Sequence, residues 1–395
     1  MRMNLKTILA AALVLLPGLL AAGAPAPAPE FTDVFIAGGD SYPAIRIPSV
    51  VVTHHGAVLA IAEARRQPGA DQAANCLILK RSTDGGRTWG ALQTIAVDGL
   101  NSLNNPTTVV EQNSGRVWLL YQRIPSHLRE MSPQTQTGYE GTNVYRNFLI
   151  WSDDEGLTWS APREVTRMTK RPTVATTVAS GPGIGIQLTR GPHPGRLIFP
   201  FNEGPFGQWN DYAVYSDDRG ETWQYGENVP GATFLNAKGK LRSQLNEVQM
   251  VELADGSVRL NSRQFGLAKV RRTSVSHDGG ATWSPVEQVP ELRDPSCMGS
   301  IFRLTFPDNG EKSRILYSGP DSLKRANGTV HLSYDEGRTW PVQRVLYPGS
   351  FAYSVLTRLP DGTIGCLFET DETDRMVFAR FTLDWLEAGT PPAAR

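Results

Sequence analysis

The sequence predicts an all-β protein, a six-bladed β-propeller with four antiparallel strands in each blade. The main observation is a motif, S-x-D-x-G-x-T-W, that occurs five times within the 395 residues. Its copies are Ser82–Trp89, Ser152–Trp159, Ser216–Trp223, Ser276–Trp283 and Ser333–Trp340. Successive copies begin 57 to 70 residues apart, which suits one four-stranded sheet with its loops.

Each copy of the motif is expected to form the turn of a β-hairpin. The Asp carboxylate can accept hydrogen bonds from nearby backbone N–H groups, and the Gly adopts a positive φ. Alternating runs such as residues 76–82 and 212–216 precede the turns. Thr and Trp then suit the start of the returning strand, with the indole folded under the turn.

The number of blades follows from the length. A lone four-stranded sheet cannot bury both faces, whereas sheets packed radially around an axis can, in sets of about 4–8. Roughly 365 residues follow the N-terminal leader, and a repeat of about 60 gives about six blades. Five blades carry the motif, so the sixth should be degenerate or closed by the two chain ends.

The N-terminus has the pattern of a cleavable secretion signal. Arg2 and Lys6 precede an apolar run, Ile8–Leu20, and residues 22–24 offer a small-residue cleavage site. A membrane anchor is the alternative, but the run is short for a spanning helix. We therefore predict a signal peptide at 1–24, a Pro/Ala-rich spacer at 25–30 and a propeller domain at 31–395. The protein should be secreted or periplasmic, without stable membrane insertion.

Composition narrows the function further. The 39 basic and 39 acidic residues balance, so no overall basic field attracts nucleic acid. The three cysteines lie in apolar runs and predict buried free thiols, with one disulfide left open. The six histidines show no metal-ligand spacing, so neither a metal nor a cofactor is expected.

Three charged residues stand out in the first blade. Arg46 lies between isoleucines, just before a strand expected at Ser49–Thr53. Such an arginine is costly to bury without an anionic partner, although an arginine that reaches the surface is the simpler interpretation. Arg65 and Asp71 follow in a polar loop, where Asp71 alone would be an ordinary turn residue.

The segment 245–263 is the most informative. Its turn at 254–256 predicts a hairpin that brings Glu247 and Arg263 to the same end of the sheet. By itself this pair could be a simple salt bridge. Glu252 has a weaker claim because it falls within the strand. Tyr353, at the start of an apolar strand, would by itself be a core tyrosine.

The repeated motif resembles the Asp box of sialidases (neuraminidases), whose fold is a six-bladed propeller. The box indicates fold and not chemistry, but further matches follow in family order from about Tyr42 to Glu369. Residues 44–48 resemble the R-I-P motif, and 247–263 resembles the family's E-x-Q…N-S-R pattern. The resemblance implies that three arginines bind the sialic acid carboxylate: Arg46, Arg263 and Arg325, with Lys324 as the fallback for the last.

The resemblance also implies the catalytic roles. Tyr353, in a Y-S-x-L match, would be the nucleophile, Glu247 its partner and Asp71 the acid/base. Arg65 resembles a family arginine that contacts the sugar ring. Asn105 stands in a place where sialidases often have an acidic residue, so that contact with the sugar is altered or absent.

This set of residues suits the chemistry of an acidic sugar. Guanidinium groups bind carboxylate in a planar fork. The substrate's own carboxylate would repel an Asp or Glu nucleophile, whereas a neutral Tyr353 can be deprotonated by Glu247. Asp71 would protonate the leaving oxygen and then activate water. The implied protein is a retaining exo-α-sialidase that acts on sialylated glycans through a tyrosyl-sialoside intermediate. Because a propeller pairs most of its own strand edges, we expect a monomer.

Three alternatives stay open. A trans-sialidase would use the same chemistry, and the Asn105 departure is compatible with a hydrolase for a related nonulosonic acid. A non-catalytic glycan-binding propeller should lack Tyr353, Glu247 or Asp71, and none is missing. Two features are equally open: the insertion 123–146, with Tyr139 and Tyr145, is a specificity loop or a surface loop, and Trp209 stacks on a sugar or packs within its loop.

Overall fold

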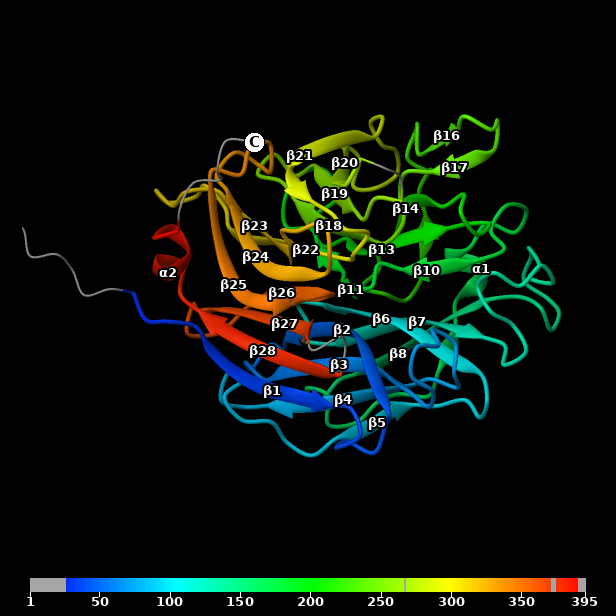
Figure 1. The fold of residues 1–395 in the computed structure, drawn as a ribbon, viewed down its shortest axis with the longest axis horizontal. Helices are drawn as coiled ribbons and strands as arrows, with labels where there is room; N and C mark the ends of the chain where they lie inside the picture. Colours follow the sequence, from blue (N-terminus) through cyan, green and yellow to red (C-terminus); the bar gives the residue numbers. More distant parts are fainter. Residues whose placement is uncertain (1–25, 266–267, 371–373, 390–395) are drawn as a thin grey trace, which may run out of the picture.

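The computed structural model describes residues 26–265, 268–370 and 374–389, whose strands form six blades around a common axis (Figure 1) and one separate two-stranded sheet. This confirms the predicted all-β, six-bladed propeller. In the first blade the strand order is β2 (Ala44–Val52), β3 (Val58–Arg65), β4 (Cys76–Ser82) and β5 (Gln93–Ala96). The second is β6 (Ser102–Val110), β7 (Val117–Ile124), β8 (Arg146–Ser152) and β9 (Arg163–Glu164), with β11 (Gly183–Ile184) parallel to β6.

The third blade has a divided inner strand, because β10 (Val178–Ser180) and β12 (Ile186–Gln187) both pair with β13. Its other strands are β13 (Leu197–Glu203), β14 (Asn210–Ser216) and β15 (Gln224–Tyr225). A separate hairpin, β16 (Thr233–Leu235) and β17 (Leu241–Ser243), follows. A four-residue helix, α1 (Thr166–Thr169), precedes this blade.

The remaining blades are regular antiparallel sheets. The fourth contains β18 (Val248–Glu252), β19 (Val258–Ser262), β20 (Val270–Ser276) and β21 (Glu287–Arg293). The fifth contains β22 (Ser300–Thr305), β23 (Arg314–Pro320), β24 (Ala326–Ser333) and β25 (Val342–Ser350). The sixth contains β26 (Ser354–Arg358), β27 (Ile364–Thr370), β28 (Arg375–Phe381) and β1 (Glu30–Ile36).

The sixth blade joins the two ends of the described chain. Strand β1, blue in Figure 1, pairs antiparallel with the red strand β28. After β28 the chain enters a helix, α2 (Leu383–Glu387), which Thr382 caps by accepting a hydrogen bond from the Trp385 amide. Strand β1, from the N-terminal end, is therefore the outer strand of a blade whose other three strands are the last in the chain. This confirms the prediction that the two chain ends close the blade. Because β1 begins at Glu30, the last residue of the predicted spacer belongs to the propeller; the predicted signal peptide lies outside the described residues.

The five Asp boxes have the same hydrogen bonds. In the first, Asp84 accepts from the Thr88 amide at 2.9 Å and from the Thr88 hydroxyl at 2.6 Å, and the Gly86 amide donates to Ser82 at 2.8 Å. Partial burial acts to raise the pKa of Asp84, but these hydrogen bonds outweigh it and lower the pKa to about 2. Each box joins the third and fourth strands of its blade, which confirms the hairpin prediction.

The glycine of each box also packs closely against a side chain of the preceding blade. The backbone of Gly86, at φ +85°, lies so close to the Phe378 ring of the sixth blade that a Cβ atom there would approach it to 2.2 Å. The same arrangement recurs around the ring, as Gly156 on Leu59, Gly220 on Trp118, Gly280 on Ala213 and Gly337 on Arg259. Where a sixth box would stand, α2 packs against β24 and β25 of the fifth blade.

The three cysteines are buried and free, as predicted from their apolar surroundings. Within the described ranges, no helix is long and apolar enough to cross a membrane. Among these described residues, we find no cluster of three or more His, Cys, Asp or Glu side chains that could hold a metal ion.

The close contact between Gly86 and Phe378 predicts a specific loss of stability for Gly86→Ala. The added methyl group meets the Phe378 ring and also forces a non-Gly residue into positive φ, so we expect a loss of roughly 3–5 kcal/mol. Gly362→Ala is the matched control, because Gly362 has a φ of +83° but nothing lies within 4 Å of the place that an added methyl group would take. It should cost only about 1–2 kcal/mol. Equal losses in urea unfolding would contradict packing between blades as the role of the box glycine.

Candidate active site

The candidate site lies on the face opposite the Asp boxes. In the first blade, β2 starts beside Arg46, β3 returns to end at Arg65, and β4 runs away again to the box at Ser82. The fourth blade repeats this course, with Glu247 just before β18 and Arg263 just after β19. The starts of the inner strands and the ends of the second strands therefore share one face.

Two inner strands begin with the same bulge. The register of β2 shifts between Arg46 and Ser49, and that of β6 shifts between Asn104 and Thr107. A residue at positive φ precedes a proline in each, Ile47 at +62° and Asn105 at +54°. Strand β2 therefore starts earlier than the predicted Ser49, because a bulge lets a strand continue past a proline. Arg46 and Asn105 lie within strands, not before them.

Each bulge is fixed by a buried glutamate of the neighbouring blade. The Ile47 amide donates to Glu369 Oε1 at 2.8 Å, and the Asn105 amide donates to Glu63 Oε1 at 2.6 Å. Both glutamate side chains are fully buried. A positive φ is costly for a β-branched residue such as Ile47. The hydrogen bonds to the glutamates offset that cost and orient the adjacent polar side chains.

Glu369 holds Arg46 at the same time. The Arg46 guanidinium makes a bidentate contact with Glu369, donating from Nε at 3.1 Å and from Nη2 at 2.8 Å. The Tyr353 amide donates to the same carboxylate at 3.3 Å, and the Glu369 amide donates to the Tyr353 carbonyl at 2.9 Å. One buried carboxylate thus sets the positions of both Arg46 and Tyr353.

Glu63 organises the opposite wall in a similar way. Its Oε2 accepts from Arg65 Nε at 3.0 Å and Nη2 at 2.9 Å, while Arg65 Nη1 donates to Asp71 Oδ1 at 2.8 Å. Burial raises the pKa of Glu63, although Arg65 and the Asn105 amide act against this. The Asp71 carbonyl accepts from Asn75 and Asn104. Asp71 is thereby anchored through its backbone, while its carboxylate is 67% exposed toward the cavity mouth.

The third unit joins Tyr353, Glu247 and Arg263. The Tyr353 hydroxyl donates to Glu247 Oε1 at 2.5 Å, and Arg263 Nη1 donates to Glu247 Oε2 at 2.7 Å and to the Tyr353 oxygen at 2.9 Å. The hairpin predicted for 245–263 is confirmed, since Val248 pairs with Ser262 and the Arg263 amide donates to the Glu247 carbonyl. Glu252, by contrast, binds Thr189 and the Arg190 amide at the other end of β18.

Two more guanidinium groups face the ring of Tyr353. The Cζ atoms of Arg46 and Arg325 lie 5.0 and 5.3 Å from its centroid. Burial and the charge of Glu247 raise the pKa of Tyr353, and the three arginines oppose this rise. Arg325 donates to the Ser296 carbonyl at 3.0 Å, whereas Lys324 is exposed to solvent. The structure therefore brings together the arginines predicted as a triad.

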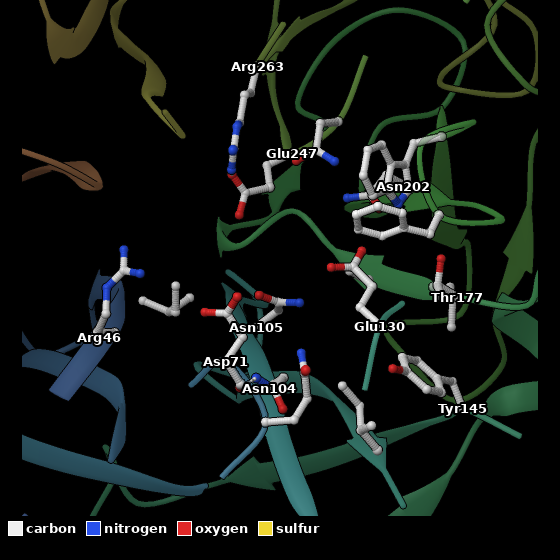
Figure 2. Close-up of a pocket in the computed structure, with 18 of the residues that line it drawn as sticks. Arg46, Asp71, Asn104, Asn105, Glu130, Tyr145, Thr177, Asn202, Glu247 and Arg263 are labelled. Atoms are coloured by element: carbon white, nitrogen blue, oxygen red, sulfur yellow. Dashed lines mark hydrogen bonds and ion pairs between the residues drawn. The ribbon is translucent and has the colours of Figure 1, made fainter. Parts of the chain in front are cut away.

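These groups line a cavity of about 290 Å³ (Figure 2). Arg46 lies on one side of it, Arg263 with Glu247 on another, and Asp71 beside Asn105 beneath them. The remaining wall mixes polar and apolar side chains: Ile124, Tyr145, Thr177, Val178, Asn202, Phe206 and Trp209. Arg325 is not part of the lining and lies over the ring of Tyr353.

Glu130 is a third carboxyl group in this cavity. It comes from the insertion between β7 and β8, and in Figure 2 its carboxyl group points toward Asn202. Burial, together with the charges of Glu247 and Asp71, raises its pKa to about 7, while Arg263 and a hydrogen bond with Trp209 oppose the rise. At neutral pH this group is therefore available both as a hydrogen-bond donor and as an acceptor.

The structure locates the two features whose roles the sequence left open, the insertion 123–146 and Trp209. The insertion supplies Glu130 and Tyr145 to the cavity, so at least this part of it is a wall of the site, while Tyr139 lies apart and donates to the Lys170 carbonyl. Trp209 is only 3% exposed. It packs edge-to-face between Phe206 and Phe265, with ring centroids 4.9 and 4.5 Å away, so it is a packed loop aromatic at the cavity wall.

Sequence reasoning missed Glu63, Glu369, Glu130 and Asp294 as parts of the site. Asp294 accepts from the Gln264 amide, beside Arg263, and from the Cys297 amide, in the loop that holds Arg325. Glu63 and Glu369 each end an apolar strand, and an acidic residue there is a usable signal, because a buried carboxylate requires partners. Glu130 carries no such signal within its polar insertion.

The arrangement can perform acid/base-assisted substitution on an anionic ligand. Clustered guanidinium groups provide the anion site. Tyr353, hydrogen-bonded to a carboxylate, is a nucleophile with an adjacent base. Asp71 is an exposed carboxyl group on the far side of the cavity, where it can exchange a proton with a leaving group.

Comparison with known proteins identifies related chains. The family model described as "BNR repeat-like domain" matches residues 56–366. The chain is 36% identical over 386 residues to a sialidase of Micromonospora viridifaciens, covering 94% of this chain and 57% of that protein. It is 28% identical over 356 residues to a sialidase of Bacteroides fragilis (strain YCH46), covering 85% and 61%. The chain thus spans about three fifths of the length of these curated relatives.

A solved structure shows the same fold. The Hadza microbial sialidase Hz136 superimposes with a TM-score of 0.77 at 28% sequence identity. The match covers 89% of this chain and 68% of that one.

Glu130 should make the stability of the protein depend on pH. Its folded-state pKa of about 7 lies above the ordinary glutamate value of 4.5. Its contribution is therefore fully present below about pH 4.5 and is lost as the pH rises through 7, on the order of 1–3 kcal/mol. Glu130→Gln should flatten the decline in unfolding free energy over this interval, measured by urea denaturation at successive pH values. Glu227→Gln, at an exposed carboxylate outside the cavity, is the control; an unchanged slope in Glu130→Gln would contradict the assignment.

Proposed function

The chain belongs to the sialidase family that carries BNR repeats, and from its site we propose that it is an exo-α-sialidase. It would remove terminal sialic acids from glycoconjugates, with retention of configuration. The single observation that carries the proposal is the Tyr353–Glu247 hydrogen bond of 2.5 Å beside three guanidinium groups. A core tyrosine or a simple Glu–Arg salt bridge would not need that concentration of positive charge.

Each group has a role in the proposed reaction. The arginines bind the carboxylate on the anomeric carbon, Glu247 takes the Tyr353 proton, and the tyrosine oxygen bonds to that carbon as the bond to the aglycone oxygen breaks. Asp71 gives its proton to the departing oxygen. In the second half, Asp71 takes a proton from water, whose oxygen replaces Tyr353, and Glu247 returns the proton to the tyrosine.

The opposite wall supports a sugar with several polar substituents. The hydroxyls of Tyr145 and Thr177 are buried and have no hydrogen-bond partner among the described residues. Buried polar atoms are normally paired, so a hydroxyl-rich or amide-bearing ligand would complete them. Asn105 contributes an uncharged amide, which also fits a related nonulosonic acid. Transfer to a sugar acceptor uses the same first half-reaction, and product identification in the presence of an acceptor sugar will distinguish it from hydrolysis.

Two finer parts of the proposal rest on sequence and topology. Export rests on the signal-peptide pattern of residues 1–24. A monomeric state rests on the way a propeller pairs its own strands, with β1 completing the last blade.

Tyr353→Phe tests the nucleophile. Removing the hydroxyl leaves the ring between the guanidinium groups but deletes the attacking oxygen, so kcat on 4-methylumbelliferyl α-sialoside should fall by about 100-fold or more. Fluorescence of the released aglycone measures this. Tyr347→Phe, at a half-buried tyrosine of β25, is the matched control and should keep wild-type turnover. Near-normal turnover of Tyr353→Phe would remove the residue from the reaction.

Arg263→Ala tests carboxylate binding. A charged hydrogen bond is worth about 1.5–3 kcal/mol, so affinity for a sialic acid α-methyl glycoside should fall roughly 10- to 100-fold. The carboxamide analogue, which lacks the charge, should lose much less. Isothermal titration calorimetry gives both constants, with Arg338→Ala on the opposite face as the control. Equal losses for the two ligands would show that Arg263 does not read the carboxylate.

A further inference from the structure

A second cavity, of about 490 Å³, adjoins the first on the side of Asp71. Its lining comes from three segments: residues 66–67 and 72–74, residues 100 and 102, and residues 125–126 and 129. Gln72 lines both cavities. Two loops separate the cavities. In one loop, Asp71 lines the first cavity and Gln72 also lines the second; in the other, Glu130 lines the first cavity and Arg129 lines the second.

The position of this cavity relates it to the leaving group. Asp71 is the group that would protonate the departing oxygen, so the aglycone must lie beyond Asp71 as seen from Tyr353. The second cavity begins at the next residue, Gln72. Arg65 and the Asn75 and Asn104 amides fix the loop that carries both residues. The sugar attached to the scissile oxygen is therefore directed toward this cavity.

The charge of the cavity is positive. Its charged lining residues are Arg66 and Arg129, and no carboxylate belongs to the lining. Neither arginine forms an ion pair with a carboxylate within the described ranges; Arg129 donates to the Ser126 and Leu128 carbonyls. The nearby acids have other partners or directions: Asp71 pairs with Arg65, Asp98 pairs with Arg123, and Glu130 faces the first cavity.

We propose that this second cavity is an aglycone subsite that favours a negatively charged sugar next to the scissile bond. Two arginines that face one recess are arranged to bind an oxyanion, and guanidinium groups pair with carboxylate and sulfate. The favoured substrates would then be sialic acid linked to a second sialic acid, or to a sulfated sugar. This rests on the proposed sialidase function and adds a substrate class to it.

The test compares kcat/KM for three substrates: an α2,8-linked disialoside, a 6-sulfated 3′-sialyl-N-acetyllactosamine and neutral 3′-sialyllactose. The wild type should favour at least one charged substrate over the neutral one by roughly 5- to 10-fold, since exposed charge pairs contribute modestly. The ratio should shrink at about 0.5 M salt, because screening weakens exposed pairs. Which charged substrate shows the preference distinguishes carboxylate from sulfate.

The double variant Arg66→Gln, Arg129→Gln should bring the charged-to-neutral ratio close to one. Arg338→Gln removes the same charge from an exposed arginine on the opposite face and should keep the wild-type ratio. A wild-type ratio near one, or the same ratio in the double variant, would overturn the proposal. The salt series requires no variant and decides the question if the double variant does not fold.

A binding arm separates the subsite from the proposed function. In the Tyr353→Phe background, calorimetric titration with the disialoside, the sulfated trisaccharide and 3′-sialyllactose measures affinity without turnover. Tighter binding of a charged ligand that the two arginine changes abolish would support the subsite, even if the wild type released no sialic acid. Equal affinities for all three ligands would overturn it, even if the wild type were fully active on 4-methylumbelliferyl α-sialoside.

Discussion

The site depends on the burial of positive charge around Tyr353. A guanidinium group inside a protein is stable only beside an anionic partner, and the penalty for an unpaired one is several kcal/mol. Glu369 supplies that partner for Arg46, and Glu247 supplies it for Arg263. The same carboxylates hold Tyr353, one through its hydroxyl and the other through its amide. The pairing that stabilises the arginines therefore also positions the reacting group.

The two faces of the propeller join neighbouring blades in different ways. On the box face, a glycine turn packs against the preceding blade, and polar contacts such as Arg81 to the Glu155 carbonyl accompany it. On the site face, a buried glutamate of one blade accepts the bulge amide of the next. Because the box face is rigidly packed, the strands are held firmly enough for the site face to include strained residues such as Ile47. A loosely held strand would not keep Ile47 at a positive φ.

Part of this could be predicted from the sequence because the signal was local. The Asp box is a turn whose residues bond to one another within seven positions, so its five copies specify five hairpins and their spacing the blade size. The hairpin of 245–263 placed Glu247 beside Arg263 for the same reason. The start of β2 was predicted too late, because a proline normally marks a strand boundary and only tertiary partners retain the bulge.

By itself the sequence determined the repeated turn, the number of sheets and the residue types that the chemistry would need. The tertiary structure decided which carboxylate serves which arginine, that Glu130 and Tyr145 of the insertion line the cavity, and that Trp209 packs between Phe206 and Phe265. The reason is distance along the chain. Arg46 and Glu369 are separated by 323 positions, and they meet because closure of the ring by β1 and β28 sets the last blade beside the first.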